Sequence, residues 1–271
     1  EIENPMDPRL ACLTLGDAGA AVILERGPNN RVGFHDIDIA TLSAYSKLCI
    51  AKATGGPHGG AIMFTDSVTQ TAIAVKHSVP YVTAVMQRHG WRPETTDHLV
   101  MHQTSEASIN DAVAAVNRVF GEGAANRDNT IYNVAERGNT ASTTHFVALM
   151  DYIRNNRIQS GDNVVFSITG SGQSVGAALY TFDDLPDRVR RSTAGRHTRG
   201  APADSGRTKI PAPARVRIDG VGVAPAGGSA APSAVQLAAD AASACLDRTG
   251  IDRSAVGLIV NSGIYRDEFL S

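Results

Sequence analysis

A chain of 271 residues with a formal net charge of −2 has no excess of basic side chains, which excludes nucleic acid as its main partner. None of its segments approaches the ~20 consecutive apolar residues of a membrane-spanning helix, so we expect no membrane partner. Hydrophobic residues make up 42% of the sequence, and its 26 glycines and 5% aromatic residues suit a layered α/β protein.

The three cysteines, Cys12, Cys49 and Cys245, lie far apart and form no CxxC pair. This spacing argues against a disulfide framework or a zinc site, and we expect no metal. Their mostly apolar or small neighbours favour the interpretation that each is a small buried hydrophobic residue. Because the first residues also lack the basic and apolar parts of a secretory signal, we expect a reduced compartment and cytoplasmic localisation.

The first third of the chain predicts two strands followed by a helix. A glycine-containing bend leads into a buried strand over residues 16–25, and residues 32–39 alternate loosely between apolar and polar side chains like a second strand. Apolar residues then recur at helical spacing from about Asp66. Pro80 is expected to end or kink this helix, with a second helical piece over 81–89.

Two short polar runs, 102–105 and 137–142, each follow a strand-like or extended stretch and open a helical pattern. The predicted helices span residues 105–120 and about 141–155. His102 and Asn139 are therefore expected at strand or loop ends beside helix starts, where ligands bind in open α/β sheets. A histidine and an asparagine there can both donate hydrogen bonds toward a developing oxyanion.

These residues also have ordinary structural interpretations. His102 can be a hydrogen-bonded structural histidine, and Asn139 can be a helix N-cap. The glycine-rich stretch 170–174 joins two predicted strands, 164–168 and 175–182, and can be a hairpin turn without any further role. We favour the interpretation in which both polar residues act in one site whose pocket the glycine-rich stretch helps to shape.

Histidines other than His102 have no spaced partners in the sequence. His145 is one of them, and we expect it to be structural or exposed.

The last third of the chain changes character twice. Residues 184–214 lack apolar periodicity and predict an exposed linker. A strand over 216–223, a helix over 233–249 and a buried strand over 256–260 then form one βαβ unit, for which a right-handed parallel crossover is expected. A lone unit of this kind leaves sheet edges uncovered, so the sequence looks cut short.

Several short motifs occur in an order and spacing typical of one family. They are Gly16-Asp17-Ala18-Gly19-Ala20, His102-Gln103, Gly138-Asn139-Thr140-Ala141-Ser142, Gly161-Asp162-Asn163, and the stretch from Gly170 to Leu179. Together they resemble β-ketoacyl-acyl-carrier-protein synthase III and its relatives in the thiolase superfamily. The agreement covers residues of about 10–183, and the combination is specific although each motif alone is weak.

The resemblance implies an α/β fold with thiolase-like layers in the order α-β-α-β-α, incomplete in this chain. Residues 1–183 resemble the C-terminal half of one synthase unit, and residues 215–271 resemble the start of the N-terminal half of another. Residues 184–214 would link the two. A section of a tandem two-synthase polypeptide and a chain with unrepresented residues both fit this order.

The resemblance also implies an enzyme of fatty-acid or polyketide biosynthesis that condenses acyl thioesters with a Cys-His-Asn triad. His102 and Asn139 match the residues that hold a thioester carbonyl, whereas no cysteine here has the context of the nucleophile, which would come from outside this chain. The residues expected to bind substrate are Thr104, Ser105, Gly170, Gly172 and Gln173.

The partners implied by the resemblance are acyl-CoA or acyl carrier protein, and a complementary thiolase half or second subunit in a homo- or heterodimer. No cofactor beyond these thioesters is expected. Two alternatives stay open: an acyltransferase to an oxygen or nitrogen acceptor, and a non-catalytic thiolase-like partner subunit or domain. The absence of a matching nucleophile supports the second alternative.

Overall fold

The computed structural model describes residues 4, 7–27, 29–53, 61–194, 216–225 and 234–256. The strands are β1 (Ala18–Arg26), β2 (Gly33–Thr41), β3 (Cys49–Ala53), β4 (Ala61–Thr65), β5 (His98–Met101), β6 (Asn163–Gly170), β7 (Ser174–Thr181) and β8 (Val216–Pro225). The α-helices are α1 (Ser67–Arg88), α2 (Glu106–Phe120), α3 (Val134–Arg137), α4 (Thr144–Arg154), α5 (Leu185–Ala194) and α6 (Ala234–Thr249). Short 3-10 helices are η1 (Leu10–Thr14), η2 (Ser43–Tyr45), η3 (Pro93–Thr95), η4 (Ala141–Thr143) and η5 (Arg253–Ala255).

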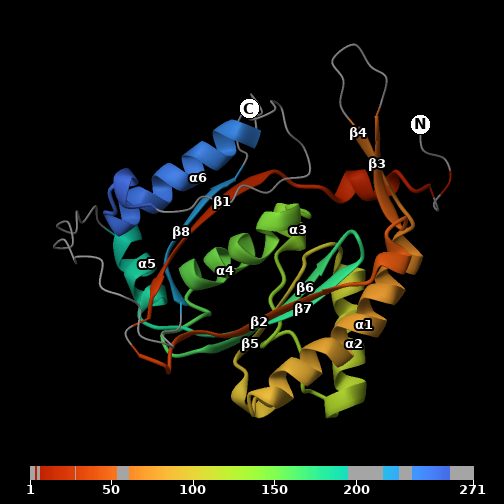
Figure 1. Ribbon diagram of the computed structural model, residues 1–271, viewed down its shortest axis with the longest axis horizontal. Coiled ribbons are helices and arrows are strands. Elements are labelled where there is room, and N and C mark those ends of the chain that lie inside the picture. Colours follow the sequence, from red (N-terminus) through yellow and green to blue (C-terminus); the bar gives the residue numbers. More distant parts are fainter. Residues whose placement is uncertain are drawn as a thin grey trace.

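The helices and sheets stack in alternating layers (Figure 1). One outer layer consists of α1 and α2, which cover one face of a four-stranded sheet with the order β2-β7-β6-β5. On the other face of this sheet lies α4, followed by a two-stranded sheet, β1-β8, whose far side is covered by α6. This is the α-β-α-β-α order predicted from the sequence.

The four-stranded sheet sets the position of the candidate site. Strands β5 and β6 are parallel, whereas β6, β7 and β2 pair antiparallel in turn, so the predicted hairpin of β6 and β7 is confirmed. Met101, the last residue of β5, lies beside Ser167 of β6. Strand β6 continues to Gly170 before the chain turns back. The hairpin tip therefore extends past the end of β5, along the same edge at which His102 follows.

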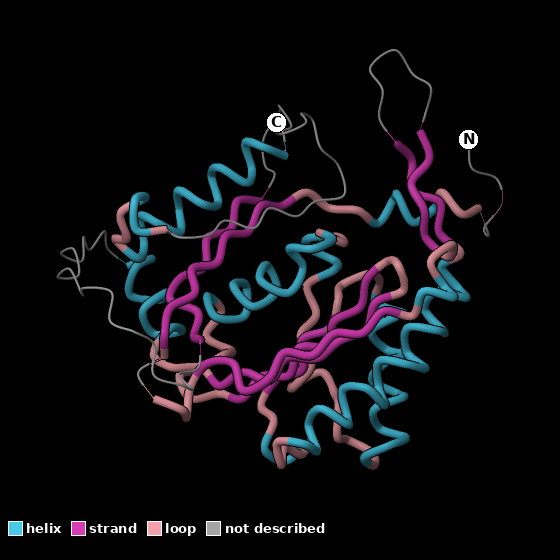
Figure 2. Tube along the Cα trace, in the orientation of Figure 1, coloured by secondary structure: helices cyan, strands magenta, loops and turns pink. Residues whose placement is uncertain are grey.

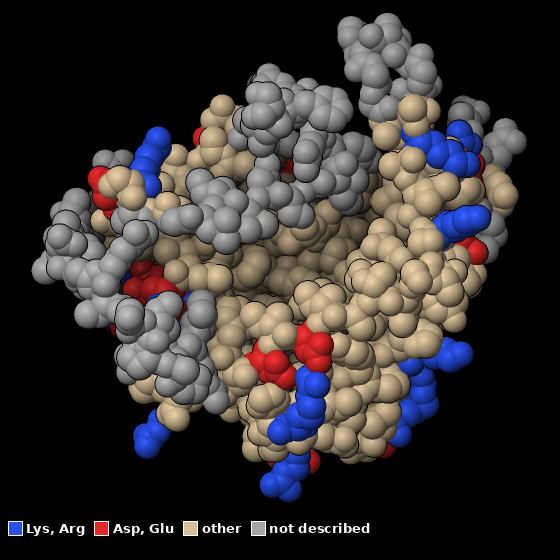
Figure 3. Space-filling view, viewed as in Figure 1, with Lys and Arg blue, Asp and Glu red and all other residues tan. Residues whose placement is uncertain are grey.

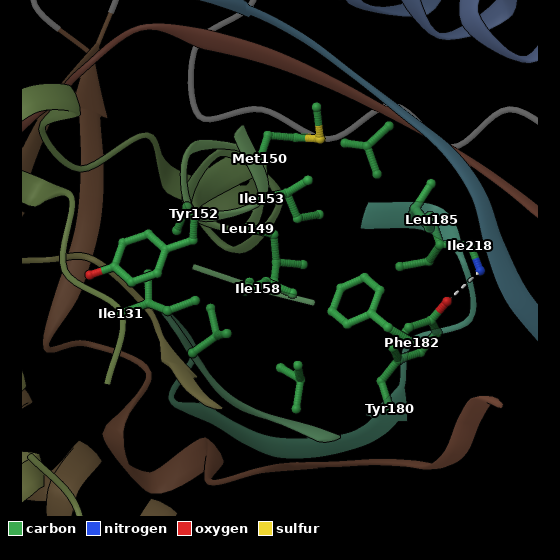
Figure 4. Packing of buried hydrophobic residues seen from close by; sticks show 14 of the residues in the cluster. Ile131, Leu149, Met150, Tyr152, Ile153, Ile158, Tyr180, Phe182, Leu185 and Ile218 are labelled. Atoms are coloured by element: carbon green, nitrogen blue, oxygen red, sulfur yellow. Dashed lines mark hydrogen bonds between the residues drawn. The ribbon is translucent and has the colours of Figure 1, made fainter. Parts of the chain in front are cut away.

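Apolar packing holds α4 between the two sheets (Figure 4). Leu149 and Ile153 of α4 belong to one buried cluster with Tyr180 and Phe182 from the end of β7. Burying side chains of this size contributes on the order of 1.5–3 kcal/mol each. The cluster also includes Ile218 of β8, whose N–H donates to the hydroxyl of Tyr180 at 3.0 Å. Both sheets are thus anchored to the same helix.

The second sheet and α6 meet at glycines. A Cβ on Gly19 of β1 would lie 2.1 Å from the carbonyl oxygen of Leu237, and one on Gly222 of β8 would lie 1.9 Å from that of Ala241. The missing side chains allow α6 to lie directly on the strands. The predicted strand and helix of this part are confirmed as β8 and α6, which pack on β1. The predicted strand over 256–260 lies almost wholly outside the described residues, and the beginning of a second unit stays a prediction.

The segment expected to be an exposed linker begins with a helix instead. Leu185 and Val189 of α5 are 1% and 4% exposed and lie one turn apart. The linker prediction is therefore wrong for Leu185–Ala194, because two apolar residues are too few to produce a periodic pattern. Residues 195–214 lie outside the described part of the chain.

A cluster of five charged residues fastens α5 to both strands of the second sheet. We call it the Arg188 cluster; its members are Glu25, Asp183, Arg188, Arg217 and Asp219. Arg188 donates to Asp183 at 3.2 Å and to Asp219 at 2.9 Å. Arg217 of β8 pairs with Asp183 and with Glu25 of β1. Elements far apart in the sequence are thereby joined by ion pairs.

The long helix does not end at Pro80 as expected. Helix α1 continues through it to Arg88, and Pro80 lies on the exposed side of the helix. Pro80 has no N–H for the carbonyl of Lys76, four residues earlier, but both residues are exposed, so water can bind that carbonyl and the proline is tolerated inside the helix. Beyond the start of α1, strands β3 and β4 form a hairpin that projects from the layers near the N-terminus (Figure 2).

Candidate active site

Two motifs meet where β5 ends at the edge of the four-stranded sheet. His102 follows β5 directly, and Asn139 follows α3. The side chain of Asn139 lies close enough to the His102 ring to raise its pKa. Asn139 also pairs through its backbone with Leu15, just before β1, so it stands between the two sheets. The structure thus brings together the two residues that the sequence singles out.

A close backbone contact fixes Asn139. Its N–H donates to the carbonyl oxygen of Thr14 at 2.7 Å, and its own carbonyl accepts from the N–H of Gly16 at 3.0 Å. Gly138, with a φ of 67°, occupies the left-handed region that favours glycine. The motifs around Gly16 and Gly138 are therefore two sides of one contact.

We expect Gly16→Ala to lower the free energy of unfolding by about 1–3 kcal/mol, the usual cost of overpacking. The added Cβ would stand 1.8 Å from the carbonyl oxygen of Arg137, so the two backbones must separate. Gly170→Ala is the control, because nothing lies within 4 Å of a Cβ there. Urea unfolding gives the stability of both variants. If Gly16→Ala and Gly170→Ala unfold at the same urea concentration, the close contact at Gly16 is contradicted.

The buried side chain of Gln103 ties the end of β5 to the loop that leads to Asn139. Its Nε2 donates to the carbonyl oxygens of Met101 and Ile131, each at 3.0 Å. Its Oε1 accepts from the N–H of Asn133 at 3.0 Å. With all three bonds made inside the protein, this amide holds His102 and the second motif in a fixed relation.

A second anchor lies further along the same loop. Arg137 donates to both carboxylate oxygens of Asp151 on α4, at 2.9 and 2.8 Å. Asn133 adds a bond to the same carboxylate at 3.1 Å. A bidentate pair of this kind fixes orientation as well as distance. The loop before Asn139 is therefore held at both of its ends.

His145 is the residue of this site that sequence reasoning missed. It lies in the first turn of α4, and its ring centroid is 6.1 Å from that of His102. Its Nε2 lies 3.1 Å from the carbonyl oxygen of Ser167 on β6. No spacing in the sequence indicates this contact, because it is formed by three separate elements.

Both imidazoles are uncharged near neutral pH. The pKa of His102 is lowered to about 3, mainly by burial and also by the neighbouring His145, while the Asn139 side chain opposes the shift. Burial also lowers the pKa of His145, opposed by the bond to Ser167. A neutral imidazole carries a single N–H. His102 can therefore donate one hydrogen bond without bringing a positive charge into the site.

This shift predicts a loss of stability in acid. Below its ordinary pKa of 6.5, His102 takes up a proton in the unfolded chain but not in the folded one until about pH 3. Acid therefore favours unfolding, by up to about 1.4 kcal/mol per pH unit within that window. We expect His102→Gln to lose less stability than the wild type between about pH 7 and pH 5. If the unfolding free energies of the two proteins, measured with urea, change equally with pH, the lowered pKa of His102 is contradicted.

Figure 3 shows a hollow near the middle of one face of the molecule. Residues other than Lys, Arg, Asp and Glu form its visible floor, whereas acidic and basic side chains gather just below it.

Two of the residues expected to bind substrate serve the start of α2. Ser105 is its N-cap: the Ser105 hydroxyl accepts from the N–H of Ser108 at 3.1 Å, and the Ser108 hydroxyl accepts from the N–H of Ser105 at 3.2 Å. The hydroxyls of Thr104 and Ser108 are hydrogen-bonded to each other. These bonds fix the turn after His102, and a contact with substrate stays a prediction for both Thr104 and Ser105.

The other three expected residues form the hairpin tip. Gly172 has a φ of 134°, which favours glycine, and nothing lies within 4 Å of a Cβ on Gly170. Gln173 is 1% exposed, and its backbone carbonyl oxygen accepts from the backbone N–H of Leu42 at 2.7 Å. The structural interpretation as a hairpin turn is correct, and the register places the tip at the sheet edge beside His102. Substrate binding by these residues stays a prediction.

The three cysteines lie in different surroundings. Burial raises the pKa of the Cys245 thiol to about 11, so it stays protonated. The thiol of Cys12 donates to the carbonyl oxygen of Met63 at 3.4 Å, and that of Cys49 accepts from the hydroxyl of Thr65 at 3.3 Å.

Within the described ranges, no group of three or more His, Cys, Asp or Glu residues could hold a metal ion. No helix there is long and apolar enough to cross a membrane.

Comparisons with known proteins point to one family. Residues 86–182 match the family model for the 3-oxoacyl-[acyl-carrier-protein (ACP)] synthase III C terminal. The chain is 28% identical over 191 residues to β-ketoacyl-[acyl-carrier-protein] synthase III 3 of Streptomyces coelicolor, covering 67% of this chain and 55% of that protein. It is 31% identical over 185 residues to β-ketoacyl-[acyl-carrier-protein] synthase III of Synechococcus sp. WH7803, covering 65% and 53%. The crystal structure of FabH from Pseudomonas aeruginosa PAO1 is similar with a TM-score of 0.49 and 21% identity, over 55% of this chain and 44% of that one.

The alternating layers and the His–Asn pair at a sheet edge define a thiolase-like α/β protein. Within that class, the chain is similar to the β-ketoacyl-acyl-carrier-protein synthase III proteins, and residues 86–182 match the C-terminal part of that family. It spans about half the length of the curated relatives it matches, 55% and 53% of the two above.

Proposed function

We propose that this chain carries the His–Asn part of an active site that condenses acyl thioesters. The observation that supports this most directly is the close approach of the His102 and Asn139 side chains, which unites two motifs distant in the sequence. An imidazole N–H and an amide N–H at one place can both donate to a single oxyanion. The matched relatives are named as β-ketoacyl-[acyl-carrier-protein] synthases, which agrees with this chemistry.

In the proposed reaction, the carbonyl oxygen of a malonyl-type thioester lies against His102 and Asn139. The bond between its α-carbon and its carboxylate breaks, carbon dioxide leaves, and the electron pair moves onto the carbonyl oxygen as an enolate. Each N–H donor then stabilises the oxyanion by about 3–4 kcal/mol. The enolate carbon attacks an acyl group carried by a cysteine, a carbon–carbon bond forms, and the thiolate leaves.

The cysteine of this reaction is proposed to come from outside this chain, in a complementary thiolase half or a second subunit of a homo- or heterodimer. The raised pKa of Cys245, which keeps its buried thiol protonated, supports this assignment. Acyl-CoA or acyl carrier protein would deliver the acyl groups. The uncharged His102 suits a thioester carbonyl, because it adds a donor and no counter-charge.

Mass spectrometry of the intact protein tests this function. After incubation with acyl-CoA and proteolytic digestion, we expect an acyl group on a cysteine other than Cys12, Cys49 and Cys245. A malonyl thioester added next is expected to remove that acyl group and release a β-ketoacyl product. Acyl groups found instead on an added alcohol or amine would favour the acyltransferase, and persistence of the acyl-cysteine would contradict condensation.

A non-catalytic partner domain is the second candidate. The observation that favours it is that no cysteine of the sequence has the context of the nucleophile and that burial keeps the Cys245 thiol protonated. Such a domain would stabilise an active one and shape its pocket. Its signature is full turnover of the intact protein when both His102 and Asn139 are replaced by alanine.

A further inference from the structure

We propose that His145 is a positioning residue for His102, fixing the ring and the single N–H that His102 presents to a thioester carbonyl. This role rests on the proposed function, because it acts through His102. It adds to that function a residue whose identity as histidine matters. Three observations carry it: the contact of the two rings, the bond that fixes the His145 tautomer, and the place of His145 in α4.

The ring of His145 is held from both sides. Its centroid lies 6.1 Å from that of His102, with the planes inclined by 50°, and 6.0 Å from that of Phe166, with the planes inclined by 52°. Phe166 is 4% exposed and belongs to the main apolar cluster. His145 therefore connects the rigid core to the ring of His102.

One hydrogen bond decides which nitrogen of His145 carries the proton. The partner of Nε2 is the carbonyl oxygen of Ser167, at 3.1 Å, and a carbonyl oxygen can only accept. Nε2 must therefore be protonated, which leaves Nδ1 of the neutral ring without a proton. A ring with a fixed tautomer presents a fixed pattern of charge to its neighbour.

The position of His145 in the chain also keeps it uncharged. It is the second residue of α4, where the helix dipole is positive and a cationic side chain is disfavoured. For the described residues, the influences on His102 are burial, His145 and Asn139, and those on His145 are burial and the Ser167 carbonyl. No carboxylate or guanidinium among the described residues is one of these influences on the pKa of either ring. The two imidazoles therefore share a site that resists a first proton and resists a second one more strongly.

These observations predict what His145 does for His102. The ring of His145 is itself uncharged and stands beside His102 in one fixed tautomer, so the neutral His102 ring faces a constant pattern of charge. The rigid ring also limits the orientations that His102 can adopt. A phenylalanine at this position would keep the shape of the ring but remove both nitrogens.

Nitrogen-detected titration of the histidine rings tests the role directly. The ¹⁵N-labelled 271-residue chain is titrated from about pH 8 to about pH 4, and long-range ¹H–¹⁵N spectra report the charge and tautomer of each ring. The signals of His102 are assigned with His102→Gln. In the wild type we expect His102 to stay neutral in one tautomer. In His145→Phe we expect the two neutral tautomers of His102 to mix, because no ring of fixed tautomer then lies beside it.

The control is His77→Phe, the same substitution on α1, where the histidine ring contacts Tyr45 instead of the site. It should leave the His102 signals unchanged. If His145→Phe does not fold, His145→Gln keeps an N–H for Ser167 and lacks the imidazole ring, so the same mixing of tautomers is expected. An unchanged single tautomer of His102 in the folded variant would overturn the positioning role.

The titration needs no catalysis, so the two proposals can fail separately. If His102→Ala condenses thioesters at the same rate as the wild type, the proposed function is wrong. The titration result for His145 and His102 is not affected by that outcome. Unchanged His102 signals in His145→Phe would remove the role of His145 and leave the His–Asn site intact.

Discussion

Replacing His102 with alanine in the intact protein is expected to lower kcat for condensation by about 10²–10³-fold, the usual effect of removing one oxyanion donor. The enolate oxygen would keep Asn139 and lose the imidazole N–H. Transfer of the acyl group to the cysteine comes earlier and does not need the enolate, so its rate should change little. Single-turnover assays of the acylated protein with a malonyl thioester separate the two steps.

Asn139→Ala is expected to cost a similar factor. The double variant should lose less than the product of the two factors, because both side chains act on one oxygen. His77→Ala is the control, since it removes an imidazole that packs against Tyr45 on another part of the molecule. Normal turnover in both His102→Ala and Asn139→Ala would exclude condensation by this pair and favour a partner domain.

The adjacency of His102 and Asn139 could be predicted because each stands at a local boundary. A short apolar strand precedes His102, and a glycine with positive φ precedes Asn139; both signals lie within a few residues of the site. The layer order was predictable from the family resemblance. Local pattern and family together thus led to the centre of the site.

His145 could not be found in the same way. Its importance comes from a ring contact with His102 and a hydrogen bond with Ser167, which lie on other elements. A histidine among apolar residues in a helix carries no spacing signal. Only the fold shows that this residue faces the site and not the solvent.

Helix α5 was missed for a related reason. Its charged residues resemble those of a solvated segment, and the sequence contains no sign that Asp219, on a distant strand, pairs with Arg188. Sequence periodicity detects apolar faces, but it does not detect a helix that is docked partly by ion pairs. The same limit hid the pairing of β1 with β8, which connects the start of the chain to a strand near its end.

Replacing Arg188 with alanine is expected to lower the free energy of unfolding by about 3 kcal/mol, the low end of the cost of removing one partner from a buried ion pair. The Arg188 side chain is 14% exposed, and the carboxylates of Asp183 and Asp219 that it binds are 7% and 10% exposed. Its loss leaves these buried charges with less compensation. Arg217 still pairs with Asp183, which places the effect at the low end.

Arg127→Ala is the matched control for this prediction. Arg127 also pairs with a carboxylate, that of Glu106, but the two side chains are 59% and 56% exposed. Exposed pairs contribute about 0–1 kcal/mol because water screens them. The unfolding free energies of the two variants, measured with urea, should therefore differ by at least about 2 kcal/mol. If they unfold at the same midpoint, burial does not strengthen the Arg188 cluster, and apolar packing alone must hold α5 and β8 on the body of the protein.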